Sequence, residues 1–213
     1  MSETAKRTVL LTSFGPFASF DVNPTQQVCE ELRNNSQHRW NEQHNVELVV
    51  EHFAVAYDDV LERVPRLWQQ LKPHLVVHLG VHGGVSNRVH VEQQTFNRGY
   101  CRKDVNGTVP LGNCVTHDAR VDKVVVSGLD VERIVQFVNA QHGDSRDRSV
   151  LVCKSVDPGR YLCGFIYGLS LTIERDRSLF VHIPVVNEQI GVTLSVLTNI
   201  VRDVILGALE QIS

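Results

Sequence analysis

Residues 8–13 read TVLLTS, and the turn-forming segment FGPF of residues 14–17 follows them directly. An apolar run of this length, bounded by Gly and Pro, predicts a buried β-strand. Asn23 and Pro24 predict the start of a helix, because Asn caps helix N-termini well and Pro suits the first helical position. The chain therefore begins with a buried strand that is followed by a helix.

The same alternation of strand and helix continues along the chain. Apolar runs predict strands at residues 46–55, 74–80, 149–154 and 179–183, with a further strand at 88–94. Helical spacing predicts helices at 58–71, 130–143, 157–172 and 188–209, and residues 97–120 show no clear period. This pattern predicts an α/β fold whose largely parallel sheet is covered on both faces, with a mixed sheet as the alternative.

Length and composition indicate one globular domain. The 213 residues are 42% apolar and 21% charged, so we expect a single domain over residues 1–213. The net charge of −3 gives no electrostatic reason to expect nucleic acid or an anionic membrane as a partner. No apolar stretch approaches the about 20 residues that span a bilayer, and residues 1–7 do not resemble a signal peptide. We therefore expect a cytoplasmic protein.

The cysteines do not form a recognisable framework. The chain has five of them, and no pair has the C-x-x-C spacing. Neither a disulfide scaffold nor a zinc site is expected from this pattern, so the thiols are expected to be free. These cysteines are Cys29, Cys101, Cys114, Cys153 and Cys163.

Several chemically interesting residues come just after predicted strands or close to their ends. They are the aromatic pair Phe14 and Phe17, the glycine-bearing segment 82–84, Cys163 and His182. In open α/β sheets, ligands bind beyond the carboxyl ends of the strands. If these strands are parallel, the four features meet at one edge of the sheet.

Cys163 is the strongest candidate for a nucleophile. A cysteine hydrolase needs a thiolate, a nearby imidazole and usually a group that orients the imidazole. Cys163 comes close to a predicted helix start, which stabilises a thiolate. From position alone, a buried core cysteine is an equally good interpretation. A core role is the better isolated interpretation of His182, and a solvated surface role is the better one for Glu92.

At these residues the sequence resembles pyroglutamyl-peptidase I, a family of cytosolic cysteine peptidases. The matching segments are SFGPF at 13–17 with VNP at 22–24, VE at 91–92 with Asn97, PGRYLC at 158–163 and FVHIP at 180–184. Each motif is short, but the four occur in the family's order and at family-like spacing. The resemblance extends from about Val9 to the last predicted helix.

The resemblance implies a function and a set of residue roles. Cys163 would be the nucleophile, His182 the general base and acid, and Glu92 the group that orients His182. Phe14 and Phe17 would form walls of a pyroglutamate pocket. It also implies a three-layer α/β/α sandwich that uses no metal or cofactor and acts on small peptides with an N-terminal pyroglutamate. It leaves the oligomeric state open.

The chain departs from the family pattern near the proposed nucleophile. Pro158 replaces the family's usual Ala, and Gly164 stands where relatives more often have Asn or Asp. These changes motivate a second hypothesis, a non-catalytic protein that binds lactam-bearing peptides on the same fold. A phosphate-using transferase is a third alternative, although the sequence has neither G-x-x-x-x-G-K-S/T nor G-x-G-x-x-G.

Overall fold

The computed structural model describes residues 6–16, 23–83, 86–118, 120–141 and 149–212. Within them, six strands form one sheet in the order β2-β1-β3-β8-β4-β7. Strands β1, β2, β3 and β8 are parallel, whereas β4 is antiparallel to β8 and parallel to β7. The strands are β1 (Arg7–Phe14), β2 (Val46–Phe53), β3 (Leu75–Val81), β4 (Arg88–Glu92), β7 (Leu151–Ser155) and β8 (Ser178–Ile183). The expected α/β fold is confirmed, and its sheet is mixed.

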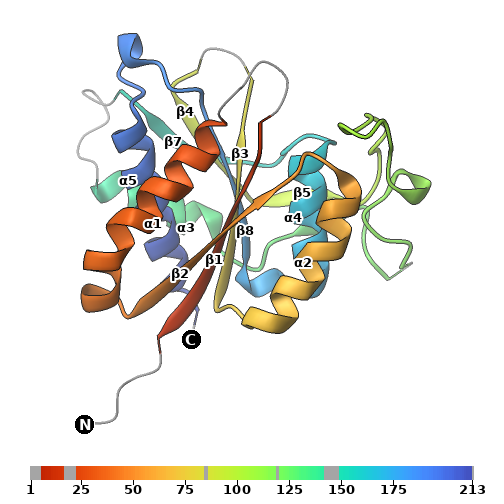
Figure 1. Cartoon of the computed structure of the whole chain (residues 1–213), viewed down its shortest axis with the longest axis horizontal. Helices are drawn as coiled ribbons and strands as arrows, with labels where there is room; N and C mark the ends of the chain where they lie inside the picture. The colour runs from red at the N-terminus through yellow and green to blue at the C-terminus, as the bar shows by residue number, and fades with distance from the viewer. Residues whose placement is uncertain (1–5, 17–22, 84–85, 119, 142–148, 213) are drawn as a thin grey trace.

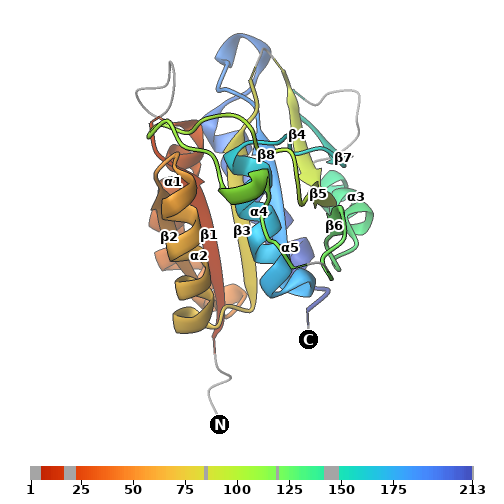
Figure 2. The same ribbon diagram turned by 90° about the vertical axis from the view of Figure 1, so that its right-hand side faces the viewer.

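Helices cover both faces of this sheet, so the molecule has three layers (Figures 1 and 2). One face carries α1 (Pro24–Gln43), α3 (Val131–Gln141) and α5 (Leu194–Leu209). The other face carries α2 (Tyr57–Leu71) and α4 (Leu162–Ile173). A two-stranded antiparallel ribbon, β5 (Gln94–Phe96) with β6 (Val124–Val126), lies beside α4. No helix in the described ranges has the length and hydropathy needed to cross a membrane.

Strand β1 explains why the strands read as continuous apolar runs. Val9 and Leu11 belong to the core beneath α1, α3 and α5, whereas Leu10 and Phe14 belong to the core beneath α2 and α4. Successive side chains of a strand point to opposite faces, and both faces of this sheet are covered. The same alternation directs His78 and Gly80 of β3 toward α2 and α4.

Two helix boundaries differ from the sequence-based expectation. The helix expected from residue 157 begins at Leu162, because Gly159 adopts a left-handed conformation with φ of 75° that a helix does not tolerate. The helix expected at 188–209 is divided into a 3-10 turn (Glu188–Ile190) and α5, with Gly191 at φ 74° between them. Thr193 then caps α5 by accepting a hydrogen bond from the backbone N–H of Val196.

Candidate active site

The antiparallel pairing of β4 with β8 brings Glu92 to His182. His90 lies opposite His182, and Glu92 lies opposite Phe180, so Glu92 is the diagonal neighbour of His182 on the same face. The Nδ1 atom of His182 is 2.9 Å from Oε1 of Glu92. Both side chains are almost completely buried, with His182 7% exposed and Glu92 1% exposed.

Cys163 approaches this pair from helix α4. It is the second residue of the helix, and its thiol lies against the backbone of Gly80, which pairs with His182 in the sheet. A Cβ atom at Gly80 would lie 2.8 Å from Sγ of Cys163, so only glycine leaves room for the thiol there. Cys163 is close enough to His182 to raise the pKa of that histidine. The structure therefore brings together the cysteine, histidine and carboxylate that the sequence analysis selected.

The route by which Cys163 reaches the site differs from the expectation. Because β7 runs opposite to β1, β3 and β8, its carboxyl end does not lie at their shared edge. The condition under which this strand would bring Cys163 to that edge, a parallel direction, is therefore not met by β7. Instead, the segment 156–161 leads to the start of α4, which lies over the face of the sheet.

The site favours a positively charged His182. Burial lowers the pKa of His182, but the charge and hydrogen bond of Cys163, together with Glu92, outweigh burial and raise this pKa to about 9. The imidazolium is thus available beside the thiol at neutral pH. The second carboxylate oxygen of Glu92, Oε2, is buried and has no hydrogen-bond partner among the described residues.

The first backbone N–H groups of α4 are not capped by the side chain of the N-cap residue. This residue, Tyr161, provides no side-chain cap hydrogen bond. The first N–H groups of an α-helix have no partner within the helix, and the helix dipole places partial positive charge there. The N–H groups around Cys163 can therefore donate to an oxyanion that forms next to the thiol.

Gly164 explains how the start of α4 fits its surroundings. A Cβ atom at this position would collide with the backbone carbonyl oxygen of Gly159, in the turn that follows Pro158. This turn occupies the space that a larger side chain at residue 164 would need. The two departures from the family pattern, Pro158 and Gly164, thus belong to one local arrangement.

The aromatic residues of the FGPF segment are only partly described. Phe14 ends β1, is buried and belongs to the same apolar cluster as Phe180. The parallel register of β1 with β3 ends at the pair Thr12 and His78, two residues before Phe14. Phe17 lies outside the described residues.

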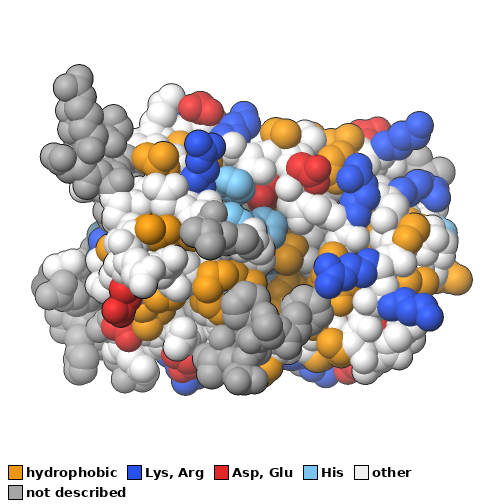
Figure 3. All heavy atoms as spheres, turned by 90° about the horizontal axis from the view of Figure 1, so that it is seen from above, with side chains coloured by type: hydrophobic (Ala, Val, Ile, Leu, Met, Phe, Trp, Pro, Cys, Tyr) orange, Lys and Arg blue, Asp and Glu red, His pale blue; other side chains and the backbone are white. Residues whose placement is uncertain are grey.

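Two further histidines lie beside His182: His82, from the segment 82–84 that the sequence analysis selected, and His90, which it did not select. The rings of His82 and His90 stack with centroids 5.1 Å apart and planes 6° apart. Histidine side chains gather beside a carboxylate on the face seen in Figure 3. Burial lowers the pKa of His90, and the neighbouring histidines lower it further, which favours its neutral form.

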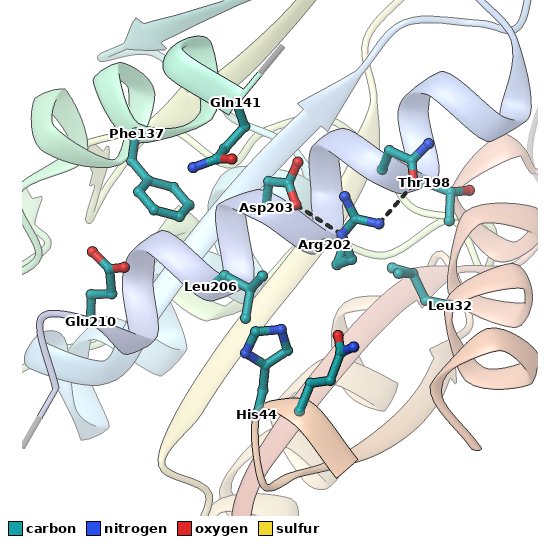
Figure 4. Close-up of a pocket in the computed structure, with 11 residues that line it drawn as sticks. Leu32, His44, Phe137, Gln141, Thr198, Arg202, Asp203, Leu206 and Glu210 are labelled. Carbon is teal, nitrogen blue, oxygen red and sulfur yellow. Dashed lines mark hydrogen bonds and ion pairs between the residues drawn. The ribbon is translucent and has the colours of Figure 1, made fainter. Parts of the chain in front are cut away.

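A described cavity lies elsewhere, between α1, α3 and α5 (Figure 4). Its volume is about 720 Å³, and its walls include Phe137, Arg202, Asp203 and Leu206. It lies on the opposite side of the sheet from Cys163 and contains none of the predicted site residues. In the described ranges, no group of three or more His, Cys, Asp or Glu side chains could hold a metal ion.

Comparison with known proteins identifies the family. The family model described as "Putative pyroglutamyl peptidase PgaPase_1" matches residues 4–187. The chain is 32% identical over 214 residues to pyroglutamyl-peptidase 1 of Mus musculus, covering 98% of this chain and 94% of that protein. It is 33% identical over 182 residues to pyroglutamyl-peptidase 1 of Homo sapiens, covering 85% and 81%.

Solved structures share the fold. The pyrrolidone carboxyl peptidase from Thermococcus litoralis superposes with a TM-score of 0.79 at 18% identity, covering 96% of this chain and 94% of that chain. Pyroglutamyl peptidase I from Bacillus amyloliquefaciens gives a TM-score of 0.78 at 19% identity, covering 98% and 100%. By the family model and the sequence relatives, the chain belongs to the pyroglutamyl peptidase family.

Proposed function

We propose that the protein is a cysteine peptidase that removes an N-terminal pyroglutamyl residue from small peptides. The observation that carries this proposal is the Cys163–His182–Glu92 arrangement in a chain of the pyroglutamyl peptidase family. Cys163 acts as nucleophile, His182 as general acid and base, and Glu92 orients His182 and favours its charged form.

The reaction begins with the thiolate of Cys163 and the imidazolium of His182. The sulfur attacks the carbonyl carbon that follows the lactam ring, and the carbonyl π electrons move to oxygen. Backbone N–H groups at the start of α4 donate to this oxyanion. The C–N bond then breaks as His182 transfers its proton to the leaving nitrogen, which releases the shortened peptide and leaves a thioester on Cys163.

Water completes the cycle. The neutral His182 removes a proton from a water molecule, whose oxygen attacks the thioester carbonyl. The C–S bond breaks, pyroglutamic acid leaves, and the thiolate and imidazolium form again. Neither step needs an oxidant, a metal or a cofactor.

The chemistry of the substrate agrees with an apolar pocket. Pyroglutamate is a neutral lactam, so its site needs no carboxylate to hold a terminal amine. A flat neutral ring is bound well by aromatic walls and a few backbone hydrogen bonds. We assign Phe14 and Phe17 to these walls, with Phe14 at the end of β1, which pairs with the strand that carries Gly80.

The site geometry favours catalysis over simple binding. The effect of Cys163 on the pKa of His182 and the fit of Gly164 to the preceding turn support a thiol that lies beside the imidazole. A cytoplasmic location remains a prediction. The five cysteines are all free, which is consistent with a reducing compartment.

One assay tests the proposal. The purified protein is incubated with a fluorogenic pyroglutamyl amide and with the matching prolyl amide, each with and without iodoacetamide. We expect cleavage of the pyroglutamyl amide alone, and we expect alkylation to abolish it. Equal cleavage of both amides would contradict the lactam specificity, and absence of cleavage with retained binding would favour the binding-protein alternative.

A further inference from the structure

A chain of buried polar groups lies beneath α4 and is not used by the proposed chemistry. Nδ1 of His78 is 2.7 Å from Oγ1 of Thr12, and Nε2 of His78 is 2.7 Å from Oγ of Ser170. The indole N–H of Trp68 donates to the same Ser170 hydroxyl at 3.1 Å. These four residues come from β1, β3, α4 and α2, and all are buried.

These four hydrogen-bonded residues lie beneath the same side of α4 as the nucleophile. Ser170 follows Cys163 by seven residues, which is about two helical turns, so the two side chains share one side of α4. His78 precedes Gly80 by two residues and shares its face of β3. Helix α4 therefore meets β3 at two points, where Cys163 lies on Gly80 and Ser170 binds His78.

Helix α4 makes two further buried hydrogen bonds, but both lead away from β3: Thr95 donates to the carbonyl oxygen of Gly164 at 2.9 Å, and the hydroxyl of Tyr167 donates to the carbonyl oxygen of Glu92 at 2.8 Å. Among the described side-chain hydrogen bonds of α4, the one between Ser170 and His78 connects the helix to β3.

The other buried residues of α4 are Leu162, Gly164, Phe165, Ile166, Tyr167, Gly168 and Leu171. Apolar burial is non-directional, so it stabilises the layer without strongly opposing a small slide or rotation of the helix. A buried hydrogen bond is directional, and breaking it leaves polar atoms without water. Sliding α4 by one residue would move the thiol by about 1.5 Å.

We propose that His78 is a positioning residue for the nucleophile: its hydrogen bond to Ser170 fixes where α4 lies on β3 and so holds Cys163 against His182. This inference rests on the proposed role of Cys163. It assigns His78 no contact with substrate or with the reacting atoms.

The protonation state of His78 suits this role. Burial lowers its pKa to about 3, so the ring stays neutral throughout the working range of a cytoplasmic enzyme. A neutral imidazole has one donor and one acceptor nitrogen. Trp68 can thus donate to Ser170, Ser170 to His78, and His78 to Thr12, which satisfies every link without a buried charge.

The test replaces the polar pair as a unit, in the double variant His78→Leu/Ser170→Ala. The double variant removes both partners of the central bond and leaves the Thr12 hydroxyl and the Trp68 indole N–H without their partners, so its melting temperature should fall. The matched control is Thr198→Val, which also removes a buried hydroxyl but on α5, across the sheet from the site. Three readouts are compared with those of the unmodified chain: the rate of Cys163 alkylation against pH, kcat and KM for a pyroglutamyl amide, and the melting temperature.

We expect kcat of the double variant to fall at least about tenfold, because small misplacements of reacting groups are costly, while KM changes by less than about twofold. The alkylation rate at neutral pH should fall because Cys163 is less closely paired with His182. The His78→Gln variant can still hydrogen-bond to Ser170, so its kcat and its rate of Cys163 alkylation should be close to those of the parent chain. Thr198→Val should change neither.

A folded double variant with unchanged kcat and an unchanged alkylation profile would overturn the proposal. If the double variant does not fold, Ser170→Ala is measured in its place, and the same unchanged readouts would overturn it. Alkylation of Cys163 does not require catalysis, so it tests the positioning proposal separately from the proposed function. If the protein cleaves no pyroglutamyl amide, the proposed function alone is refuted. A wild-type alkylation profile that His182→Ala leaves unaltered would refute the positioning proposal.

Discussion

Glu92 holds His182 across an antiparallel strand pair, with Oε1 2.9 Å from Nδ1, although the two residues are 90 positions apart in the sequence. This contact occupies Nδ1 of the ring and leaves Nε2 as the nitrogen that the proposed mechanism uses. It also contributes to the raised pKa of His182. This contact links the geometry of the site to its expected pH dependence.

The first prediction concerns the fall of kcat/KM at alkaline pH, the alkaline limb of the pH profile. His182 must carry a proton for the leaving nitrogen, and its pKa is about 9, so kcat/KM should fall as pH rises through about 9. Glu92→Gln removes the negative charge, so the pKa of His182 should fall and this limb should move to lower pH. We also expect kcat/KM to fall by about 10²- to 10⁴-fold at neutral pH, because the variant no longer stabilises the imidazolium.

Rate measurements between pH 6 and pH 10 test this prediction. Iodoacetamide alkylation provides the internal comparison, because it needs only the thiolate and should remain fast above pH 9. If kcat/KM falls at the same alkaline pH in the parent and in the Glu92→Gln variant, Glu92 does not raise the pKa of His182.

The second prediction concerns Gly164. Gly164→Asn restores a side chain that relatives more often carry, yet its Cβ would collide with the carbonyl oxygen of Gly159. The turn or the helix start must move, so kcat should fall about tenfold or more and Cys163 alkylation should slow. The control is Gly207→Ala, whose Cβ would lie 2.9 Å from the Phe137 ring on the other side of the sheet.

Comparing these two variants separates a displacement of the Cys163 thiol from a general loss of stability caused by poor packing. Gly207→Ala is expected to affect the melting temperature and to leave kcat and alkylation unchanged. Gly164→Asn with parental kcat would mean that the turn at Gly159 adapts without disturbing the thiol.

The third prediction concerns Phe14 as a wall of the substrate pocket. Phe14→Leu keeps an apolar side chain in the core but removes the flat ring face, so KM for a pyroglutamyl amide should rise several-fold with a smaller change in kcat. Phe53→Leu is the matched control, because Phe53 is the register partner of Phe14 on β2 and belongs to the same apolar cluster. Equal changes in KM for both variants would indicate a packing effect rather than contact with substrate.

The fourth prediction concerns acid stability. The pKa of His78 is lowered to about 3 in the folded state, whereas an unfolded histidine titrates near its ordinary value of 6.5. Between these values the unfolded chain binds more protons, so the contribution to stability is complete above about pH 6.5 and is lost as pH falls. The loss approaches about 1.4 kcal/mol for each pH unit.

Urea unfolding at pH 7, 6, 5 and 4 measures this effect. The free energy of unfolding should fall less steeply with acid in His78→Leu/Ser170→Ala than in the parent chain, because the variant lacks the buried imidazole. Parallel curves for the two proteins would contradict a neutral, buried His78.

The sequence predicted the layers of the fold better than its strand directions. The apolar runs at Leu75–Val81 and Ser178–Ile183 are buried on both faces, and this is visible in the sequence. The reversed direction of β4 and β7 is not visible, because an apolar run reads the same whichever way its strand points. The late start of α4 also depends on the left-handed conformation of Gly159, which local sequence does not fix.

The candidate site could be predicted only in part. Position gave Cys163 as one plausible thiol among several and placed His182 near the end of a strand. The family motifs added Glu92 and the roles of all three residues, which remain predictions. His78 and Ser170 were missed because each is a single polar residue within an apolar segment. Only the packing of α4 on β3 shows that they bind each other across 92 positions.

The central claim is that Cys163 carries the acyl group during cleavage of a pyroglutamyl peptide bond. The most direct measurement compares turnover of a fluorogenic pyroglutamyl amide by the parent chain, by Cys163→Ala and by Cys101→Ala, which removes an exposed free thiol instead. We predict that Cys163→Ala lowers kcat by at least about 10³-fold and that Cys101→Ala retains parental kcat. Undiminished turnover by Cys163→Ala would contradict the account.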